Sequence, residues 1–141
     1  RRQRQMCIRD RERTIQDMNN FVDLFEIKQI NHDQTNGIFK FEMPITDICK
    51  QPFGYLHGGV SVAFAETACS MAAMEVICDD QIAFGLEINA NHVKSKREGI
   101  LYATAKSLHI GKSSHVWSVE ITDEADELIC VSRCTMAIRN K

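Results

Sequence analysis

One carboxylate stands out in the sequence because it interrupts a long apolar segment. Between His57 and Glu75 the only formally charged residue is Glu66, which lies in the run VSVAFAETACSMAAM. Burying a carboxylate costs free energy unless the group is hydrogen-bonded, neutral or functional. A glutamate in such a place can act as a general base or as a nucleophile. The alternative interpretation is a structural carboxylate that a neighbouring subunit caps.

The neighbours of this glutamate are small if the segment is a helix. At about 100° per residue, the face that carries Glu66 comprises Gly59, Ala63, Ser70, Ala73 and Ile77. Small side chains let a substrate or another backbone approach closely. Ser70 lies one turn after the glutamate, where its hydroxyl can donate a hydrogen bond to the carboxylate.

The tripeptide His57-Gly58-Gly59 directly precedes this segment. Backbone N–H groups at a helix N-terminus bind developing negative charge, so a thioester carbonyl placed there would be polarised as in an oxyanion hole. Gln51 supplies an amide that can hold a water or the carbonyl, and His57 can contact the thioester oxygen or protonate the leaving thiolate. The alternative is a glycine-shaped turn with a solvated histidine. The solitary glutamate seven residues after Gly59 favours the catalytic interpretation.

Two basic turns that contain glycine suit the phosphates of a nucleotide. They hold Lys94, Lys96 and Arg97 before Gly99, and Lys112 after Gly111. The alternative, two solvated hairpin turns, is the more common situation for any single lysine. The remaining histidines show no ligand spacing such as H-E-x-x-H, so we expect no metal.

The elements that must position these residues are two strands, one long helix and four more strands. The predicted strands span 25–30, 38–43, 82–93, 100–109, 114–122 and 128–138, with the long helix at 58–77 and a short helix at 14–18. Asn36-Gly37 is a strong hairpin-turn pattern. Short polar connections between strands imply an antiparallel sheet, and one helix across its face gives an α+β fold. Because the helix is apolar on nearly every side, we expect a second subunit to cover part of it.

Composition sets further limits on the class of protein. A chain of 141 residues fits one domain, and a net charge of −2 argues against nucleic acid as a partner. The six cysteines form no C-x-x-C pair and no secretory signal is present, which indicates a reducing, cytoplasmic setting. The apolar segment 58–74 carries polar residues and is short for a bilayer span of about 20 residues, so we expect no membrane insertion.

The beginning of the chain differs from the rest in character. The sequence RRQRQMCIRDR is basic and has no periodicity. Its second half, MCIRDR, reads like a translated transposon end from a sequencing library. We therefore expect residues 1–11 to be a cloning or assembly scar, or else a disordered basic arm, and residues 12–141 to form the domain.

Three segments carry a family resemblance. QPFGYLHGGVSVAFAET resembles the hotdog-fold acyl-CoA thioesterases that use a glutamate on the helix. GLEINANHVKSKREG and LHIGKSSHVWSVEITDE resemble the aryl-CoA branch, which includes 1,4-dihydroxy-2-naphthoyl-CoA hydrolases of menaquinone biosynthesis and Arthrobacter-type 4-hydroxybenzoyl-CoA thioesterases. The resemblance covers 14–138 and is more specific for the family than for the substrate.

The resemblance implies an activity and an assembly. We expect the protein to hydrolyse an acyl- or aroyl-CoA to the free acid and CoA. The substrate that the resemblance favours is 1,4-dihydroxy-2-naphthoyl-CoA or a related aryl-CoA. CoA is part of the substrate, so no separate cofactor is expected. The family fold is a helix wrapped by an antiparallel sheet of five or six strands, in homodimers or homotetramers with active sites between subunits.

The resemblance also implies roles for individual residues. It makes Glu66 the nucleophile or general base and gives the Gly58 N–H the task of polarising the thioester carbonyl, with Gln51 and His57 assisting. Ser70 fills the position of a hydroxyl that supports the carboxylate. Residues that match family contacts to CoA are Gly85, His92, Val93, Lys94, Ser95, His109, Ile110, Gly111, Lys112, Ser113 and Ser114.

Two rival functions share the fold. A hotdog dehydratase also has an acidic residue on the central helix, but it pairs that residue with a histidine in an H-F-P-G-type loop, which this chain lacks. A non-catalytic acyl-CoA-binding hotdog protein is the rival from another class. The intact set of Glu66, Gln51 and Ser70 argues against it.

Overall fold

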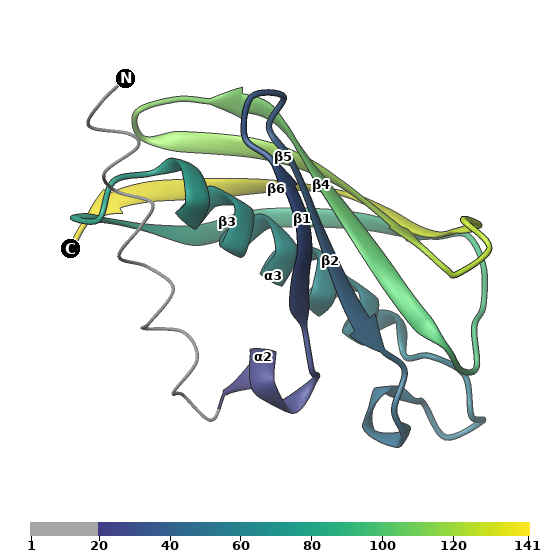
Figure 1. Ribbon diagram of the computed structural model, residues 1–141. Helices are drawn as coiled ribbons and strands as arrows, with labels where there is room; N and C mark the ends of the chain where they lie inside the picture. Colours follow the sequence, from purple (N-terminus) through teal and green to yellow (C-terminus); the bar gives the residue numbers. More distant parts are fainter. Residues whose placement is uncertain (1–19) are drawn as a thin grey trace.

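The computed structural model describes residues 20–141 as one helix-and-sheet unit. Its elements are α2 (Phe21–Leu24), β1 (Lys28–Asp33), β2 (Ile38–Pro44), η2 (Asp47–Cys49), α3 (Gly58–Val76), β3 (Gln81–His92), β4 (Ile100–Ile110), β5 (Ser114–Thr122) and β6 (Leu128–Asn140). The six strands form one antiparallel sheet in the order β1-β2-β4-β5-β6-β3. The helix α3 lies along one face of this sheet (Figure 1), so the predicted α+β hotdog arrangement is confirmed.

Most predicted elements agree with the structure to within two residues, but the first strand does not. It was expected at 25–30 and lies at Lys28–Asp33. The reason is the short helix α2, in which Asn20 Oδ1 accepts a hydrogen bond from the Val22 N–H at 2.9 Å. Glu26 then takes a positive φ of 54°, which delays the start of the strand. The predicted helix at 14–18 and the segment 1–11 lie outside the described residues.

The turn between β1 and β2 requires glycine at its last position. Gly37 has a φ of +65°, in the left-handed region, and its carbonyl accepts a hydrogen bond of 2.9 Å from the Ser107 N–H. A Cβ atom at position 37 would overlap the Ser107 hydroxyl. The Asn36-Gly37 pattern therefore identified the hairpin correctly, and the close approach to β4 adds a second reason for glycine.

The core lies between α3 and the inner face of the sheet. Along β5 the side chains of Trp117, Val119 and Ile121 are fully buried, which is the alternation of a strand with one covered face. They face the buried side of α3, where Ala65, Ala68 and Ala72 alternate with Phe64 and Cys69. Small side chains on the helix let it approach the sheet closely.

Within residues 20–141, one edge of the sheet and one side of the helix are open. The edge strand β3 exposes Phe84 and Leu86, at 54% and 62% of their surface. On α3 the apolar side chains of Val62, Met71 and Met74 are only half-buried. Apolar surface on an unpaired strand edge is a common site of association.

We predict that Gly37→Ala destabilises the fold by at least about 1 kcal/mol, because alanine is strained at a positive φ and its Cβ meets Ser107. Urea unfolding monitored by circular dichroism gives the free energy of unfolding. The double variant with Ser107→Ala should recover part of the loss, since the hydroxyl contact is gone. A Gly37→Ala protein as stable as the wild type would contradict this account of the turn.

Candidate active site

The side chain of Glu66 lies directly against the backbone of β3. A Cβ atom at position 85 would overlap Glu66 Oε1, so Gly85 is needed for the carboxylate to reach its place. At this point the pairing of β3 with β6 shifts register between Gly85 and Glu87. Bulges of this kind re-aim the backbone and often lie next to active sites. Glu66 is half-buried there, beside the open edge of the sheet.

The predicted hydrogen bond between Ser70 and Glu66 is not formed. Ser70 is half-buried one turn after the glutamate. Within residues 20–141 its hydroxyl makes no hydrogen bond to the carboxylate, which is turned towards Gly85 instead. The expected supporting role of Ser70 is therefore not part of this conformation.

The N-terminus of α3 is capped by His57. Its Nδ1 accepts a hydrogen bond from the Gly59 N–H at 2.9 Å, and its own backbone N–H donates to the Cys49 carbonyl at 2.8 Å. Because Gly58 is the first residue of the helix, its N–H has no partner within the helix. The cap thus holds the loop in place while leaving the Gly58 N–H for an incoming oxygen.

A pocket opens at this end of the helix. Its volume is about 340 Å³, and it is lined by Leu56, Gly58, Ser61, His92, Val93, Lys94, Ser95, Lys96 and Ile129. The His92 ring packs on Gly58, where a Cβ atom would lie only 3.0 Å from Nε2. The structure therefore brings four predicted CoA contacts, His92 to Ser95, together with the predicted carbonyl-binding N–H of Gly58.

The side chain of Gln51 serves the loop that precedes α3. Its Oε1 accepts a hydrogen bond from the Phe53 N–H, and its backbone N–H donates to the Tyr55 carbonyl at 2.8 Å. Gly54 takes a φ of +87° within the same turn. This arrangement fixes the amide and leaves its Nε2 hydrogens as donors.

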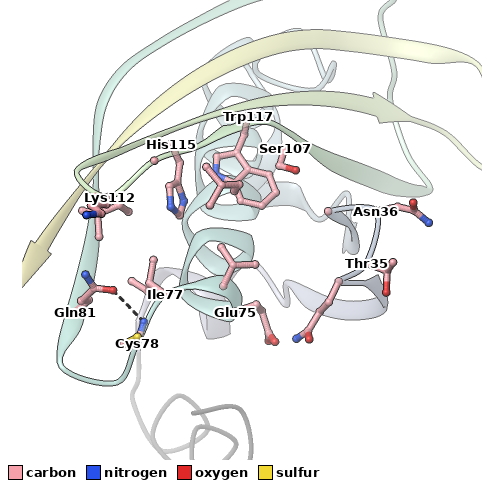
Figure 2. A pocket seen from close by; sticks show the side chains of 16 residues that line it. Thr35, Asn36, Glu75, Ile77, Cys78, Gln81, Ser107, Lys112, His115 and Trp117 are labelled. Carbon is pink, nitrogen blue, oxygen red and sulfur yellow. Dashed lines mark hydrogen bonds between the residues drawn. The ribbon is translucent and has the colours of Figure 1, made fainter. Parts of the chain in front are cut away.

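The second predicted CoA segment lies at the other end of the helix. Of the turn from His109 to Ser114, the residues Ile110, Gly111 and Lys112 line a cavity of about 780 Å³ beside the last turn of α3 (Figure 2). The Gly111 N–H donates to the Ser114 carbonyl at 2.9 Å, which closes the turn. A helix of 19 residues is about 28 Å long, so one protomer keeps the two predicted CoA segments apart.

Most of the basic side chains in the first turn already have partners. Lys94 forms an ion pair with Glu127. Lys96 Nζ lies 3.1 Å from a carboxylate oxygen of both Asp123 and Glu124. The Arg97 guanidinium stacks over the Tyr55 ring, 4.0 Å from its centroid. Lys96 and Arg97 thus hold the loops together and do not form a free phosphate grip.

Asp123 is a structural residue that the sequence analysis missed. It is 5% exposed, and its Oδ1 accepts hydrogen bonds from the Ala125 and Glu127 N–H groups at 2.9 and 3.0 Å. Burial works to raise the pKa of Asp123, but the hydrogen bonds from Lys96 and Ala125 outweigh it and hold that pKa below its usual value. The acidic segment at 123–127 looked like an ordinary polar connection, so nothing in the pattern marked this residue.

Three thiols lie inside the fold close to Glu66 or on the strand β6. Cys69 on α3 and Cys130 and Cys134 on β6 are buried and free. A hydrogen bond with Cys134, burial and the nearby charge of Glu66 all raise the pKa of Cys69, which keeps this thiol protonated. These cysteines therefore pack as small apolar side chains.

Two further features of residues 20–141 bear on the kind of site. No helix in this part of the chain is long and apolar enough to cross a bilayer. No group of three histidine, cysteine or acidic side chains here gathers closely enough to hold a metal ion.

We predict that Lys96→Met lowers the melting temperature most near pH 7. Hydrogen bonds with Glu124 and Asp123 raise the pKa of Lys96. The pKa of Glu124 is lowered first by the Ile100 N–H and then by Lys96, and Lys96 also lowers the pKa of Asp123. Groups with lowered pKa values stabilise the fold above their ordinary values of 3.8 and 4.5 and lose this effect as the pH falls through the lowered values. The difference in melting temperature between wild type and variant should therefore become smaller in acid.

Differential scanning calorimetry from about pH 2 to pH 8 measures this gap. Lys106→Met is the matched control, because Lys106 is exposed on β4 and should change the melting temperature little at any pH. A gap for Lys96→Met that stays constant down to about pH 2 would show that the ion pairs contribute nothing.

Comparison with known proteins agrees with this geometry. Residues 53–130 match the model of the thioesterase superfamily. A 1,4-dihydroxy-2-naphthoyl-CoA hydrolase of Listeria monocytogenes is 55% identical over 100 residues, which are 71% of this chain and 81% of that protein.

Two solved structures of a Staphylococcus aureus protein, one of them described as a thioesterase enzyme, resemble the fold. They are 43% and 44% identical, with TM-scores of 0.82 and 0.79, and they cover 86% and 84% of this chain and 100% and 97% of their own. One carries a glutamate-to-alanine and the other a glutamine-to-alanine substitution, at positions fifteen residues apart. Gln51 and Glu66 have the same spacing here.

Proposed function

We propose, because this chain belongs to the thioesterase superfamily, that Glu66 is the carboxylate with which it hydrolyses an aryl-CoA thioester. The chain is an acyl-CoA thioesterase, so its products are a free acid and CoA. The observation that carries the proposal is the contact of Glu66 with Gly85, which directs the carboxylate to the open edge of the sheet. The proposed substrate is 1,4-dihydroxy-2-naphthoyl-CoA or a related aryl-CoA, because a relative at 55% identity is named a 1,4-dihydroxy-2-naphthoyl-CoA hydrolase.

The proposed chemistry uses two groups on α3 that lie eight residues, or about 12 Å, apart along one helix, so they act on one thioester from two different subunits. The thioester oxygen accepts a hydrogen bond from the Gly58 N–H, and the positive end of the helix dipole stabilises the charge that develops on it. Glu66 then either attacks the thioester carbon, giving an anhydride that water cleaves, or takes a proton from an attacking water. In both routes the carbon–sulfur bond breaks and CoA leaves as a thiolate that takes up a proton.

Gln51 and His57 assist the reaction that we propose. Gln51 donates from Nε2 to the carbonyl oxygen or to the water, because its Oε1 is already held by the Phe53 N–H. His57 keeps Nδ1 on the Gly59 N–H, so only its Nε2 is left for the sulfur of the leaving group. The substituted glutamate and glutamine of the Staphylococcus aureus structures share the spacing of Gln51 and Glu66, which supports this pairing.

We further propose a homodimer, or a tetramer built from such dimers, with active sites between subunits. The exposed apolar side chains of Phe84 and Leu86 lie on the edge strand β3 and would be covered by a second copy. The pocket beside Gly58 holds only one of the two predicted CoA segments. In the dimer, the turn from His109 to Ser114 of the other copy supplies the second, with Lys112 as its cation.

We predict that Glu66→Gln keeps the fold and loses hydrolysis. The amide is nearly isosteric, so packing against Gly85 should survive, but it can neither attack the thioester nor accept a proton. Losing a positioned base typically lowers kcat by about 10²–10⁴-fold. Release of CoA from an aryl-CoA measures kcat, and the melting temperature of the same sample measures stability.

The matched control is Glu75→Gln, on the same helix and also half-buried, which should leave kcat within about twofold of wild type. As a second approach, Gly85→Ala places a Cβ on the carboxylate and should lower kcat with Glu66 intact. A Glu66→Gln enzyme within about tenfold of wild type would show that this glutamate is not the catalytic group.

We predict that Leu86→Lys disrupts assembly and activity together. A charge on the edge of β3 opposes pairing of two sheets, whereas it leaves the core of the protomer untouched. Light scattering gives the molar mass, and the aryl-CoA assay gives kcat and KM. Ile30→Lys, a change of an exposed residue on the opposite edge strand β1, is the control. A fully active, monomeric Leu86→Lys protein would rule out sites shared between subunits.

A further inference from the structure

We propose that the cavity at the C-terminal end of α3 is a second binding site, which takes a small neutral phenol. The cavity has a volume of about 780 Å³ and is bordered by the β1–β2 turn, the last turn of α3, and the facing ends of β4 and β5 (Figure 2). None of Glu66, Gly85 and Gly58 lines it. The site is therefore separate from Glu66 of the same protomer, although it shares Ile110, Gly111 and Lys112 with the turn that we propose as a CoA contact of the other copy.

Two buried side chains in this cavity have polar atoms without a partner. His115 and Trp117 are 1% and 0% exposed, and both line the cavity. Nothing in residues 20–141 hydrogen-bonds to His115 Nδ1 or to Trp117 Nε1. An unsatisfied buried polar group costs about 1–3 kcal/mol, so one that persists indicates a missing partner. Two such groups side by side are a stronger indication than one.

The types of the two atoms select the partner. The indole Nε1–H of Trp117 can only donate. Burial lowers the pKa of His115, and the nearby His109 adds to this effect, so the imidazole is neutral and one of its nitrogens is an acceptor. The two rings are neighbours on β5, with centroids 6.1 Å apart. With the proton on Nε2, one hydroxyl between them accepts from Trp117 and donates to His115 Nδ1.

Other oxygen groups fit the pair less well. A carbonyl oxygen satisfies both atoms only when the His115 proton is on Nδ1, whereas a hydroxyl group satisfies both in either tautomer. A carboxylate would satisfy Trp117 and could pair with Lys112, which also lines the cavity, but it has no hydrogen for His115 Nδ1. A hydroxyl group satisfies both atoms and brings no charge.

The walls and the size indicate the rest of the ligand. Val76, Ile77, Ile110 and Ile138 give the cavity apolar sides. Trp117 already packs edge-on against Phe39, with centroids 5.8 Å apart, and a further aromatic ring can pack beside it in the same manner. A volume of about 780 Å³ is far more than a single water needs, about 30 Å³, and lies within the range of small-molecule pockets.

The chain offers a direct probe, because Trp117 is its only tryptophan. In a proton–nitrogen correlation spectrum of the full chain, one indole N–H signal reports on the cavity. We expect para-ethylphenol to shift this signal and the Gly37 amide in a saturable manner, with the Gly58 and Gly85 amides unchanged. Its methyl ether, para-ethylanisole, cannot donate to His115 and should bind at least tenfold more weakly.

Variants of His115 test the same contact from the protein side. His115→Phe keeps a ring but has no hydrogen-bond acceptor, so it should weaken the binding of para-ethylphenol at least tenfold. His115→Gln restores a side-chain acceptor and should recover part of the affinity. His32→Phe, at an exposed histidine of β1, is the control and should bind as wild type. The dispersion of each spectrum shows whether the variant is folded.

Three results would overturn the proposal. Absence of a saturable shift in the wild type would mean that the two atoms are satisfied by water alone. Equal affinity for the phenol and its methyl ether would exclude the bridging hydroxyl without recourse to any variant. Shifts at Gly58 and Gly85 in place of the indole would assign the phenol to the catalytic pocket.

Discussion

Burial of the helix α3 is the constraint on which the rest of this structure depends. The helix is apolar on its inner side, where Phe64, Ala65 and Ala68 are fully buried against the sheet. A helix of this kind is stable only when it is covered, and one antiparallel sheet covers only one side. The remaining side carries the half-buried Glu66 and faces the open edge strand β3. Glu66 thus lies on the side of α3 that the sheet does not cover.

The short connection between α3 and β3 explains why Glu66 meets Gly85. After the helix ends at Val76, the chain turns within four residues and β3 runs back beside it. Ten residues of helix from Glu66 span about 15 Å, and four residues of strand to Gly85 span about 13 Å. The two residues therefore lie at the same level. The same argument brings His92, at the end of the strand, back to Gly58 at the start of the helix.

Regular features of the fold could be predicted from the sequence, and side-chain partners could not. The strand pattern around Trp117 follows from its period-two alternation, and the helix at 58–77 follows from an apolar run that is too long for a strand. The start of β1 was misplaced because the cap at Asn20 and the positive φ of Glu26 depend on local geometry that has no periodicity. For the same reason the sequence suggested Lys96 as a phosphate contact. In the structure it forms ion pairs with Asp123 and Glu124, which are 27 and 28 positions away along the chain.

The alternation of strand directions accounts for the separation of the two predicted CoA segments. In an antiparallel sheet, successive turns lie at opposite ends. The β3–β4 turn therefore lies at the end where α3 begins, together with the β5–β6 turn, and the ion pair of Lys94 with Glu127 joins them. The β4–β5 turn lies at the other end, together with the β1–β2 turn and the last residues of α3.

A single protomer cannot bring these two ends together without breaking the sheet. A two-fold axis at the β3 edge, as in the dimer that we propose, reverses the direction of the second copy. The end that carries Lys112 in one copy then lies beside the end that carries Gly58 and His92 in the other. Composite sites are thus the simplest way in which this topology can bring both predicted CoA segments to one CoA molecule. The open edge of β3 and the placement of Glu66 beside it both follow from the order of the strands in the sheet.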